Sequence, residues 1–343
     1  SNPICTSGIM KNTAGSINYN PNGRGDPAVF SGEGMPNMLT GRFAPSPSGR
    51  MHLGNVFSAL LAWLSVRSRN GRMLLRIEDL DPDRCRPDYI ETLKRDLDWL
   101  GLDWDEEQTP QSMRADAYHA EFERLRALGL VYPCYCSRAE LHAASAPHAS
   151  DGNVIYAGTC RSLTEAERAA KIRKPAWRVI VPDTVITVQD GLQGAYTENL
   201  ARDCGDFIIR RSDGVYAYQL AVVTDDAAGG VTEVIRGRDL LSSVPRQMWL
   251  QKTLGFPTPA YYHVPLLLAP DGRRLSKREK SLDLGALRER CTPEQLVGTL
   301  AFLAGLQPEP APAAPAALVS GFAWKNVQSD NVVIHSEFGC DIS

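Results

Sequence analysis

Apolar positions follow two different spacings in the first part of the chain. Short apolar runs occur at Leu39–Ala44 and Met73–Leu80, whereas apolar residues recur at helical spacing in Val56–Arg69 and Tyr89–Leu100. Short strands that alternate with amphipathic helices are typical of a parallel sheet covered by helices. The pattern therefore predicts strand, helix, strand, helix in that order, and an α/β fold.

The middle of the chain departs from this pattern and then returns to it. A segment with Cys, Ala and His residues is followed by a charged helix from Leu163 and by short strands within Trp177–Val188. After this insertion, Asp206–Arg211 and Val215–Thr224 are predicted strands, and Val244–Leu254 is a predicted helix. These elements predict the second half of a Rossmann-like nucleotide-binding core.

The predicted division of the chain has six parts. They are a leader at 1–38, the first half of the core at 39–131, an insertion at 132–200, the second half of the core at 201–262, a basic-loop and helical subdomain at 263–306, and an Ala/Pro-rich, unpatterned tail at 307–343. The leader is rich in Gly, Asn, Ser and Pro, and we expect it to be disordered. Met35 and Met38 are candidate natural starts, in which case the residues before them would come from cloning.

Composition narrows the class of protein. Hydrophobic residues make up 43% and charged residues 22% of the 343 residues, as in ordinary globular proteins. Apolar runs all fall short of the ~20 residues that cross a bilayer, and the start lacks a secretory pattern, so we expect a cytoplasmic protein. The net charge of -3 argues against capture of nucleic acid by a globally basic surface. Any RNA contact would need a local basic face.

The first candidate motif is a loop rich in Pro and Ser, Arg42–Gly49, followed by His52–Asn55 at the start of a helix. A helix N-terminus attracts anions through its backbone N–H groups and its dipole, and Gly54 would allow close approach of a nucleotide. His52 would either donate a hydrogen bond to a phosphate or simply cap the helix.

The second motif is Arg76–Asp81, where acids gather near the end of a predicted parallel strand. Ligands of open α/β sheets bind at such ends. Glu78 would hold the ammonium group of an amino acid, or else pair with Arg84 and Arg86. For Asp81, which precedes a proline, we favour a structural role.

The third and fourth motifs lie further along. Asp225 and Asp226 follow an apolar run and would line a ligand site or cap a turn, and Tyr216 could fill the core. Arg236 lies in an apolar stretch and therefore needs a carboxylate or phosphate partner. The segment Arg273–Arg278 is a basic loop, either merely solvated or placed to stabilise a leaving pyrophosphate.

With these motifs in this order, residues 39–285 resemble the catalytic core of class I aminoacyl-tRNA synthetases, in particular the glutamyl branch. The resemblance implies an enzyme that activates L-glutamate with ATP and Mg²⁺, in a Rossmann-like core. Two positions depart from the usual pattern: Asn55 replaces a second histidine, and Arg274-Leu275 replaces Lys-Met or Lys-Leu.

The resemblance also implies roles for individual residues. The catalytic residues would be His52 and Lys277; ATP would be bound by His52, Gly54, Asn55 and Lys277; and glutamate would be bound by Arg42, Phe43, Ala44, Pro45, Ser46, Glu78, Tyr218 and Arg236. Glutamine would leave a buried guanidinium unpaired, at a cost of about 2–5 kcal/mol. Aspartate would be too short to reach.

The cysteines favour a metal site. Eight cysteines with uneven spacing are too few for a disulfide scaffold. Cys134, Cys136 and the later Cys160 make a plausible zinc clamp, and the resemblance implies Zn²⁺ bound by these three with Tyr156. Either His142 or His148 is an alternative fourth ligand to Tyr156.

Only 63 residues (343 − 280) follow Lys280, so we do not expect the large anticodon-reading region of full-length glutamyl enzymes. The chain therefore resembles the truncated paralogues of that branch, which place glutamate on queuosine at the wobble position of tRNA(Asp). The resemblance implies a monomer whose core docks on the anticodon stem-loop. Basic residues of the insertion would form the RNA face: Arg161, Arg168, Lys171, Arg173, Lys174 and Arg178. The alternatives are a glutamyl-tRNA synthetase fragment that acts on a tRNA 3′ end and a non-catalytic RNA-binding paralogue.

Overall fold

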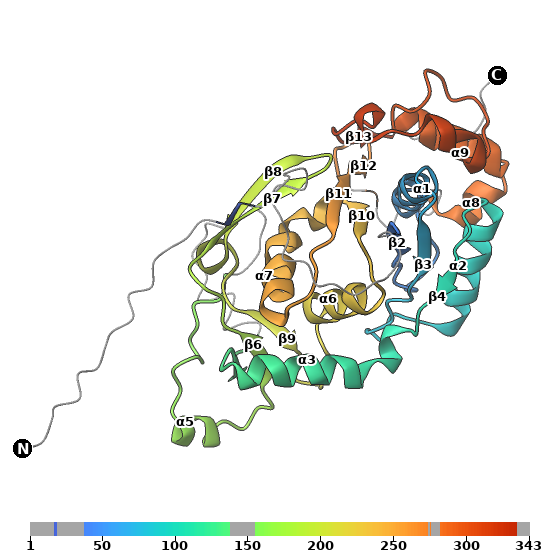
Figure 1. Cartoon of the computed structure of the whole chain (residues 1–343). Helices are drawn as coiled ribbons and strands as arrows, with labels where there is room; N and C mark the ends of the chain where they lie inside the picture. Colours follow the sequence, from blue (N-terminus) through green and yellow to red (C-terminus); the bar gives the residue numbers. More distant parts are fainter. Residues whose placement is uncertain (1–16, 19–37, 138–154, 274, 276–281, 335–343) are drawn as a thin grey trace, which may run out of the picture.

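The computed structural model describes residues 17–18, 38–137, 155–273, 275 and 282–334 (Figure 1). At its centre are two groups of parallel strands. The first is β2 (Thr40–Phe43), β3 (Arg72–Leu75) and β4 (Glu106–Glu107), and the second is β10 (Glu233–Gly237) and β11 (Ala260–Val264).

The two groups lie side by side through β2 and β10. The N–H of Thr232 donates to the carbonyl of Thr40 at 2.9 Å, and the Arg42 side chain reaches the carbonyl of Ile235 at 3.4 Å. The later residue of β2 contacts the later residue of β10, so the two strands run in the same direction. The described strands therefore follow the order β4-β3-β2-β10-β11, which confirms the predicted parallel sheet.

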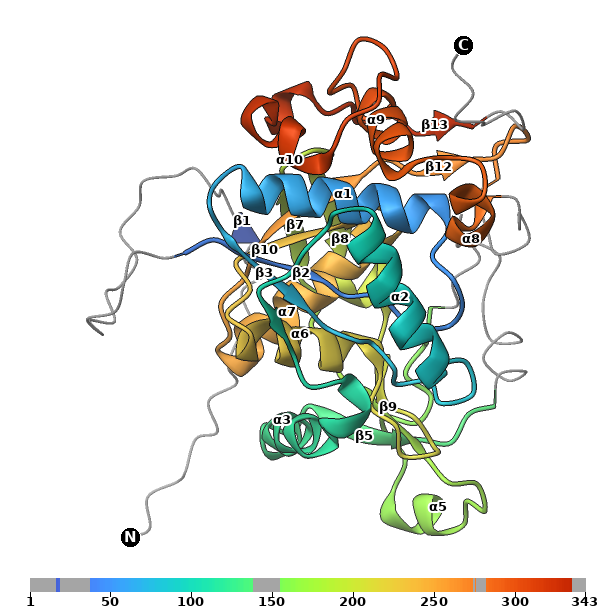
Figure 2. The same ribbon diagram turned by 90° about the vertical axis from the view of Figure 1, so that its right-hand side faces the viewer.

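Helices cover both faces of this sheet (Figures 1 and 2). Helix α1 (Leu53–Arg67) lies on one face, and α6 (Tyr218–Ala228) and α7 (Val244–Leu254) lie on the other. Helix α1 is apolar nearly all round, because the sheet lies below it and the C-terminal part of the chain lies above it. Gly41 permits the close approach of α1, since a Cβ there would clash with Val66.

Most elements of the core appear where the pattern predicts them. The helix predicted at Tyr89–Leu100 is α2 (Pro87–Trp99), and the predicted α7 has the observed bounds. The predicted strand Met73–Leu80 ends early, at Leu75. The residues after it remain attached to the preceding loop, since the N–H of Glu78 donates to the carbonyl of Pro45 at 3.0 Å.

The strand predicted at Val215–Thr224 is wrong, because most of this segment belongs to helix α6. Its residues from Leu220 to Asp226 are all buried, so the run has no polar face from which a helical period could be recognised. Burial on every side, rather than the local preference of Val222, Val223 and Thr224 for strands, decides the conformation.

The insertion is tied to the core by antiparallel strands. After the short 3₁₀ turn Gln111–Met113 and helix α3 (Ala115–Ala127) come β5 (Val131–Cys134), β6 (Ala176–Val179) and β9 (Phe207–Arg210), in the order β5-β6-β9. The predicted charged helix is α5 (Glu165–Ala169), which projects at the lower end of Figures 1 and 2.

A second part of the insertion is the hairpin of β7 (Val185–Asp190) and β8 (Gly194–Asn199), which leads into a π-helical turn at Leu200–Cys204. Strand β7 also pairs in parallel with β1 (Ile17–Asn18). The hairpin tip is joined to β11, because the N–H of Gly191 donates to the carbonyl of Tyr261 at 2.8 Å.

The C-terminal part packs over α1. It contains α8 (Leu284–Arg288), α9 (Pro293–Leu303), α10 (Pro315–Leu318), 3₁₀ turns at Val319–Gly321 and Trp324–Asn326, and β13 (Val332–Val333), which pairs with β12 (Leu267–Leu268). Trp324 stacks on Tyr262 at 4.3 Å between ring centroids and donates to Ser65 of α1. The part of the unpatterned tail that the structure describes is thus joined to the core.

Within the described residues, the helices are too short or too polar to span a membrane.

Candidate active site

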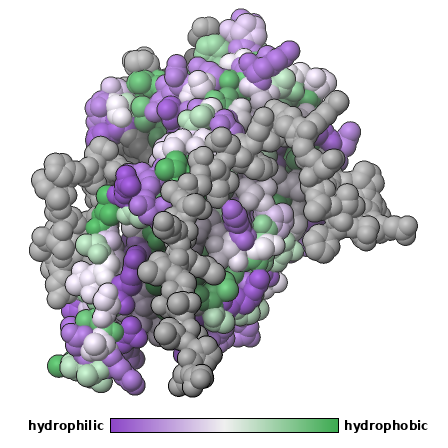
Figure 3. Space-filling model, turned by 60° about the vertical axis from the view of Figure 1, so that its left-hand side comes forward, coloured by the Kyte–Doolittle hydropathy of each residue, from purple (hydrophilic) through white to green (hydrophobic). Residues whose placement is uncertain are grey.

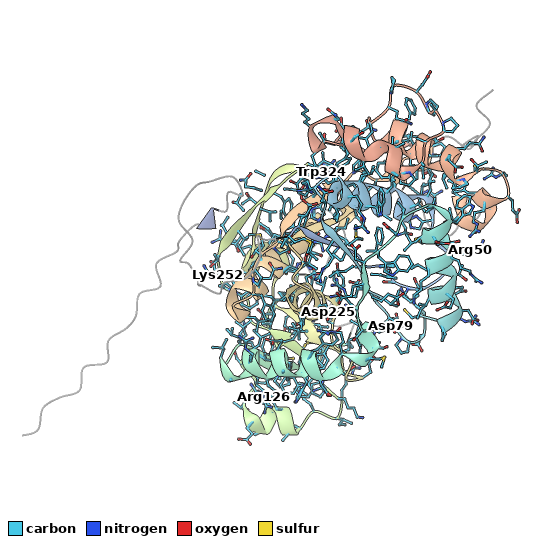
Figure 4. The ribbon with its side chains drawn as sticks, turned by 45° about the vertical axis from the view of Figure 1, so that its right-hand side comes forward. Arg50, Asp79, Arg126, Asp225, Lys252 and Trp324 are labelled. Carbon is cyan, nitrogen blue, oxygen red and sulfur yellow. The ribbon has the colours of Figure 1, made fainter. Side chains whose placement is uncertain are left out.

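A cavity of about 490 Å³ opens where β2, β3 and β10 end. It is lined by every described residue for which the sequence predicted a role in binding glutamate or ATP: Arg42, Phe43, Ala44, Pro45, Ser46, His52, Gly54, Asn55, Glu78, Tyr218 and Arg236. Lys277 lies outside the described residues. Arg50 and Asp79, which follow the carboxyl ends of β2 and β3, lie on the same side of the molecule in Figure 4.

Arg76, a fully buried side chain, joins the acids beneath the cavity. Its Nη1 lies 2.7 Å from Oδ1 of Asp226 and its Nη2 lies 3.1 Å from Oε1 of Glu78. Burial alone would lower the pKa of Arg76, but the charges of Asp226, Glu78 and Asp225 outweigh it and hold the pKa above its ordinary value. Arg76 therefore stays charged and fixes both carboxylates.

Arg42 shares one of these carboxylates. Its Nε lies 3.3 Å from Oδ1 of Asp226, and its Nη1 donates to the carbonyl of Ile235. Burial acts to raise the pKa of Asp226, but the positive charges of Arg76 and Arg42 lower it by more. The pKa of Asp226 is therefore below its ordinary value. Among the described residues, Nη2 of Arg42 has no hydrogen-bond partner, and it remains available to a ligand in the cavity.

Glu78 lines the cavity, and 10% of its side chain is exposed. It pairs with Arg76 rather than with Arg84 or Arg86; Arg84 instead contacts Asp81, which has the structural role that we favoured. Burial raises the pKa of Glu78 above its ordinary value, although Arg76 and Arg42 oppose the rise. A cation in the cavity would offset this cost of burying the charged form.

Arg236 is 6% exposed and is held by neutral groups. Nε donates to Nε2 of His263 at 3.0 Å, Nη1 to the hydroxyl of Tyr218 at 3.2 Å, and Nη2 to Oε1 of Gln247 at 2.9 Å. No carboxylate of the described residues lies within ion-pair distance of it. The anionic partner that the sequence predicted for Arg236 is therefore absent among the described residues, and an anionic ligand in the cavity would supply it.

Neighbouring acids of α6 have distinct roles. Asp225 accepts from Gln111, Tyr118 and Arg114, away from the cavity, whereas Asp226 faces Arg42 and Arg76. Neither caps a turn, because both lie inside a helix. Figure 4 shows Asp225 near the middle of the molecule.

Tyr216 has the core role that we considered. It is 6% exposed and packs edge-on against Tyr118 and Phe122.

His52 is the N-cap of α1. Its Nδ1 accepts from the N–H of Gly54 at 3.2 Å, and the Oδ1 of Asn55 accepts from the N–H of His52. Since Nδ1 is an acceptor, the ring hydrogen of the neutral imidazole lies on Nε2, which is a donor. A Cβ at Gly54 would stand 3.2 Å from the His52 ring, so the glycine makes room for that ring. Capping and a phosphate contact are therefore compatible, since they use different nitrogens.

The cysteines of the insertion converge. The Sγ atoms of Cys134, Cys136 and Cys160 lie within 4.8 Å of one another. The hydroxyl of Tyr156 is 3.5 Å from Sγ of Cys134 and 3.8 Å from Sγ of Cys136. Tetrahedral zinc with Zn–S bonds of about 2.3 Å separates its ligands by about 3.8 Å, so these four groups fit the metal. His142 and His148 lie outside the described residues.

Arg178 completes the surroundings of this cluster. Its guanidinium carbon is 3.9 Å from the ring centroid of Tyr156, and its Nε donates to Sγ of Cys134 at 3.3 Å. Burial acts to raise the pKa of Cys134, but hydrogen bonds from Tyr156, the backbone of Cys136 and Arg178 outweigh it, and the pKa is lowered. A lowered pKa favours the thiolate of Cys134, which is the metal-binding form, whereas burial raises the pKa of Cys136 to about 12 and also raises the pKa of Tyr156.

Two residues of the predicted RNA face, Arg178 and Arg161, contact Asp206. Arg178 is 6% exposed and donates to the carbonyl of Asp206 at 2.6 Å. Arg161 makes a two-pronged ion pair with the buried carboxylate of the same Asp206. Including Arg178 in an RNA face was wrong, because its side chain is buried against Asp206, whereas Arg161 remains exposed.

Sequence reasoning missed three residues behind the cavity: Arg76, Gln247 and His263. Arg76 could have been found by the rule that singled out Arg236, because it is also an arginine in an apolar stretch. Gln247 and His263 are separated from Arg236 by 11 and 27 positions, and their sequence surroundings carry no signal of the contact.

Fold and site together define the catalytic core of a class I aminoacyl-tRNA synthetase. The family model described as tRNA synthetases class I (E and Q), catalytic domain, matches residues 38–313, and the chain belongs to this family.

Within it, the chain is similar to proteins named glutamyl-Q tRNA(Asp) synthetase. The relative from Nitratidesulfovibrio vulgaris is 50% identical over 291 residues, which are 81% of this chain and 90% of the relative. The relative from Symbiobacterium thermophilum is 48% identical over 315 residues, which are 88% and 97%. These matches confirm the predicted resemblance.

A solved structure agrees. The glutamate tRNA ligase from Elizabethkingia meningosepticum, in complex with its amino acid, is 26% identical with a TM-score of 0.73. The match covers 86% of this chain and 66% of that one. The likeness supports the assignment of the fold to the class I synthetases.

Proposed function

We propose that this chain joins L-glutamate to ATP to form glutamyl-adenylate, and then transfers the glutamyl group to queuosine at the wobble position of tRNA(Asp). The observation that carries the proposal is the shared cavity of Arg42, Arg236 and Glu78, with His52 at its edge. Two guanidinium groups and one carboxylate match the side-chain carboxylate and the ammonium group of glutamate.

The charges around the cavity support one orientation of bound glutamate. Its side-chain carboxylate lies between Arg236 and the Nη2 of Arg42, and its ammonium group lies against Glu78. Tyr218 stands beside Arg236 and lines the same wall, while Phe43, Ala44, Pro45 and Ser46 supply the adjoining wall. Glutamine would replace a charge-assisted pair by a neutral contact, which explains a preference for glutamate.

ATP binds along the loop that leads into α1. The Nε2–H of His52 and the N-terminus of α1 face phosphate oxygens, and Gly54 and Asn55 line the same side of the cavity. Class I synthetases use Mg²⁺ with ATP, and the ion would neutralise part of the phosphate charge. We assign Lys277 to the leaving pyrophosphate from the resemblance alone.

The reaction then has two steps. An oxygen of the glutamate α-carboxylate attacks the α-phosphorus of ATP, and the bond to pyrophosphate breaks. A cyclopentene hydroxyl of queuosine next attacks the carbonyl carbon of the adenylate, forming an ester and releasing AMP. The protein contributes chiefly by orientation and by fixed charges, because the substrates carry the reacting atoms themselves.

The cysteine cluster would hold Zn²⁺ as a structural ion. Cys134, Cys136, Cys160 and Tyr156 supply four ligands, which leaves no open position of the kind that catalytic zinc keeps. The ion would join β5 to the segment around Cys160, in an insertion with little apolar core of its own.

We assign the RNA face to the end of the insertion, beyond α5. Lys171, Arg173 and Lys174 are exposed there, next to Ile172, which is fully exposed. The lower end of the molecule, where α5 lies, is largely hydrophilic with apolar residues between (Figure 3). Exposed cations beside an apolar side chain suit a single-stranded loop, in which phosphates and unstacked bases are both accessible.

Glutamate-dependent exchange of pyrophosphate into ATP, without RNA, tests the activation step. Transfer of labelled glutamate to tRNA(Asp) with and without queuosine then tests the acceptor. We expect exchange without RNA and transfer only to the queuosine-containing tRNA. Exchange that requires tRNA would favour a 3′-end synthetase, and no exchange under any condition would favour a non-catalytic RNA-binding protein.

A further inference from the structure

Behind Arg236, on the side away from the cavity, lies a fully buried pair of side chains, Asp190 and His263. Oδ2 of Asp190 is 2.5 Å from Nδ1 of His263, and neither side chain is exposed. Nε2 of the same ring is 3.0 Å from Nε of Arg236. The three side chains come from β7, β11 and β10, so the contact joins the insertion to the cavity wall.

The geometry fixes the protonation of the ring. The Nε of an arginine is always a donor, so Nε2 of His263 must accept and the ring hydrogen must lie on Nδ1. That hydrogen is donated to Asp190. Burial and the nearby charge of Arg236 lower the pKa of His263 despite the opposing effect of Asp190, which favours the neutral ring.

Asp190 is itself fixed in one orientation. Its Oδ1 accepts from the N–H groups of Leu192, Gln193 and His263, at 3.0, 2.9 and 3.1 Å. These contacts close the turn of the β7–β8 hairpin and leave only Oδ2 to face the ring. The carboxylate therefore cannot rotate without losing backbone partners.

We propose that Asp190 and His263 are positioning residues, which hold Arg236 in the orientation that receives the side-chain carboxylate of glutamate. The inference rests on the proposed function. Among the described residues, Arg236 donates to His263, Tyr218, Gln247 and the carbonyl of Leu240, and of these four acceptors only His263 is itself oriented by a buried charge. An arginine with no protein carboxylate to orient it needs such support, because its fork must be aligned before the substrate arrives.

The variant Asp190→Asn tests the pair while keeping its shape. Three backbone N–H groups require the amide oxygen at the Oδ1 position, so the amide NH₂ must face His263. The ring then has to accept at Nδ1 and carry its hydrogen on Nε2, where it opposes the Nε–H of Arg236. We expect the KM for glutamate in pyrophosphate exchange to rise about 10- to 100-fold, with the KM for ATP unchanged.

Two substitutions at the histidine separate hydrogen bonding from packing. His263→Gln places an acceptor near the position of Nε2, and we expect it to retain much of the affinity for glutamate. His263→Leu fills similar space without an acceptor, and we expect a loss as large as that of Asp190→Asn. A merely structural pair would make both variants lose stability without separating the KM for glutamate from that for ATP.

Glu233→Gln is the matched control. Glu233 is a buried carboxylate on the same strand as Arg236, and it is held by Ser65 and Arg69 instead of facing the cavity. We expect this variant to lower the melting temperature and to leave the KM for glutamate unchanged.

The tautomer of His263 gives a readout that needs no activity. Nitrogen-15 NMR of labelled histidine, assigned with His263→Gln, should show the Nδ1–H form in the wild type and the Nε2–H form in Asp190→Asn. An Nε2–H ring in the wild type, or an unchanged KM for glutamate in Asp190→Asn, would overturn the inference. If the wild type shows no glutamate-dependent exchange, the proposed function is wrong, whereas the NMR result still decides the tautomer.

Discussion

Arg236 illustrates how a single buried charge indicates a substrate. Its contacts are a histidine ring, a phenol, an amide and a carbonyl, all of them neutral. Burying a guanidinium is costly when no carboxylate pairs with it, and none of the described residues supplies one, so we expect an anionic substrate to complete the site. Arg42 and Arg76 differ, because both already pair with Asp226.

Replacing Arg236 by glutamine should therefore weaken glutamate specifically. We expect the KM for glutamate to rise by a factor that corresponds to about 2–5 kcal/mol, with little change in the KM for ATP, as measured by pyrophosphate exchange. Arg114→Gln is a suitable control, since Arg114 pairs with Asp225 and does not line the cavity. Equal effects of the two variants on the KM for glutamate would contradict the assignment of Arg236.

Glu78 should give the reaction an acidic limb. Glutamate needs the ionised form of Glu78 to bind its ammonium group, and burial raises the pKa of this carboxyl. As the pH falls through the raised pKa, Glu78 becomes protonated, and kcat/KM for glutamate should fall. The midpoint should lie above the ordinary pKa of a glutamate side chain.

Glu78→Gln checks this reading, because it removes the titrating group. We expect a lower kcat/KM at every pH and no limb at the raised midpoint. An acidic limb that persists unchanged in this variant would show that another group titrates.

At the scale of elements, the zinc cluster tests how the insertion is held together. Cys136→Ser should lose the metal, as measured by elemental analysis, and should lower the melting temperature. Pyrophosphate exchange should be less affected, because none of the cluster residues lines the cavity. Cys204→Ser is the control, since Cys204 is a free cysteine of the same region outside the cluster. Equal metal content in the wild type, Cys136→Ser and Cys204→Ser would exclude this site.

The basic tip beyond α5 should matter only for RNA. The double substitution Lys171→Gln and Lys174→Gln removes two exposed charges, and we expect it to weaken the binding of tRNA. In a plot of the logarithm of the binding constant against the logarithm of the salt concentration, we expect a slope that is less steep by about 1.5. Exchange without RNA should be unchanged. The matched control is Lys252→Gln with Lys325→Gln, also two exposed lysines, which lie on α7 and near the C-terminal part. Equal losses of tRNA affinity in both would contradict the assignment.

Which elements could be predicted depends on their exposure. Helix α2 has one buried face and was recognised from its spacing, whereas the buried α6 was taken for a strand. The same limit applies to the site. Arg42, Glu78 and Arg236 could be recognised because they are charged residues in apolar segments. Their partners could not, because the fold brings Asp226 to Arg42 across 184 residues and His263 to Arg236 across 27. Spacing along the chain carries no information on such contacts.

The whole molecule brings together segments that are far apart in sequence. Strands β2 and β10 contribute Arg42 and Arg236, and the segment after β3 contributes Glu78. The start of α1 supplies the anion-binding N-terminus, and the insertion supports β11 from behind. Because parallel strands end at one edge, the loops that follow them converge there. The C-terminal part stabilises this arrangement by covering α1, with Trp324 contacting both β11 and the helix.

A crystal structure of the complex with a non-hydrolysable glutamyl-adenylate analogue would locate each group of the substrate in the cavity. We expect the side-chain carboxylate to lie within hydrogen-bonding distance of Arg42 and Arg236, the ammonium group to contact Glu78, and the adenylate to lie against His52 and the start of α1. A complex in which the carboxylate contacts neither arginine, or in which the ammonium group lies away from Glu78, would contradict this binding mode.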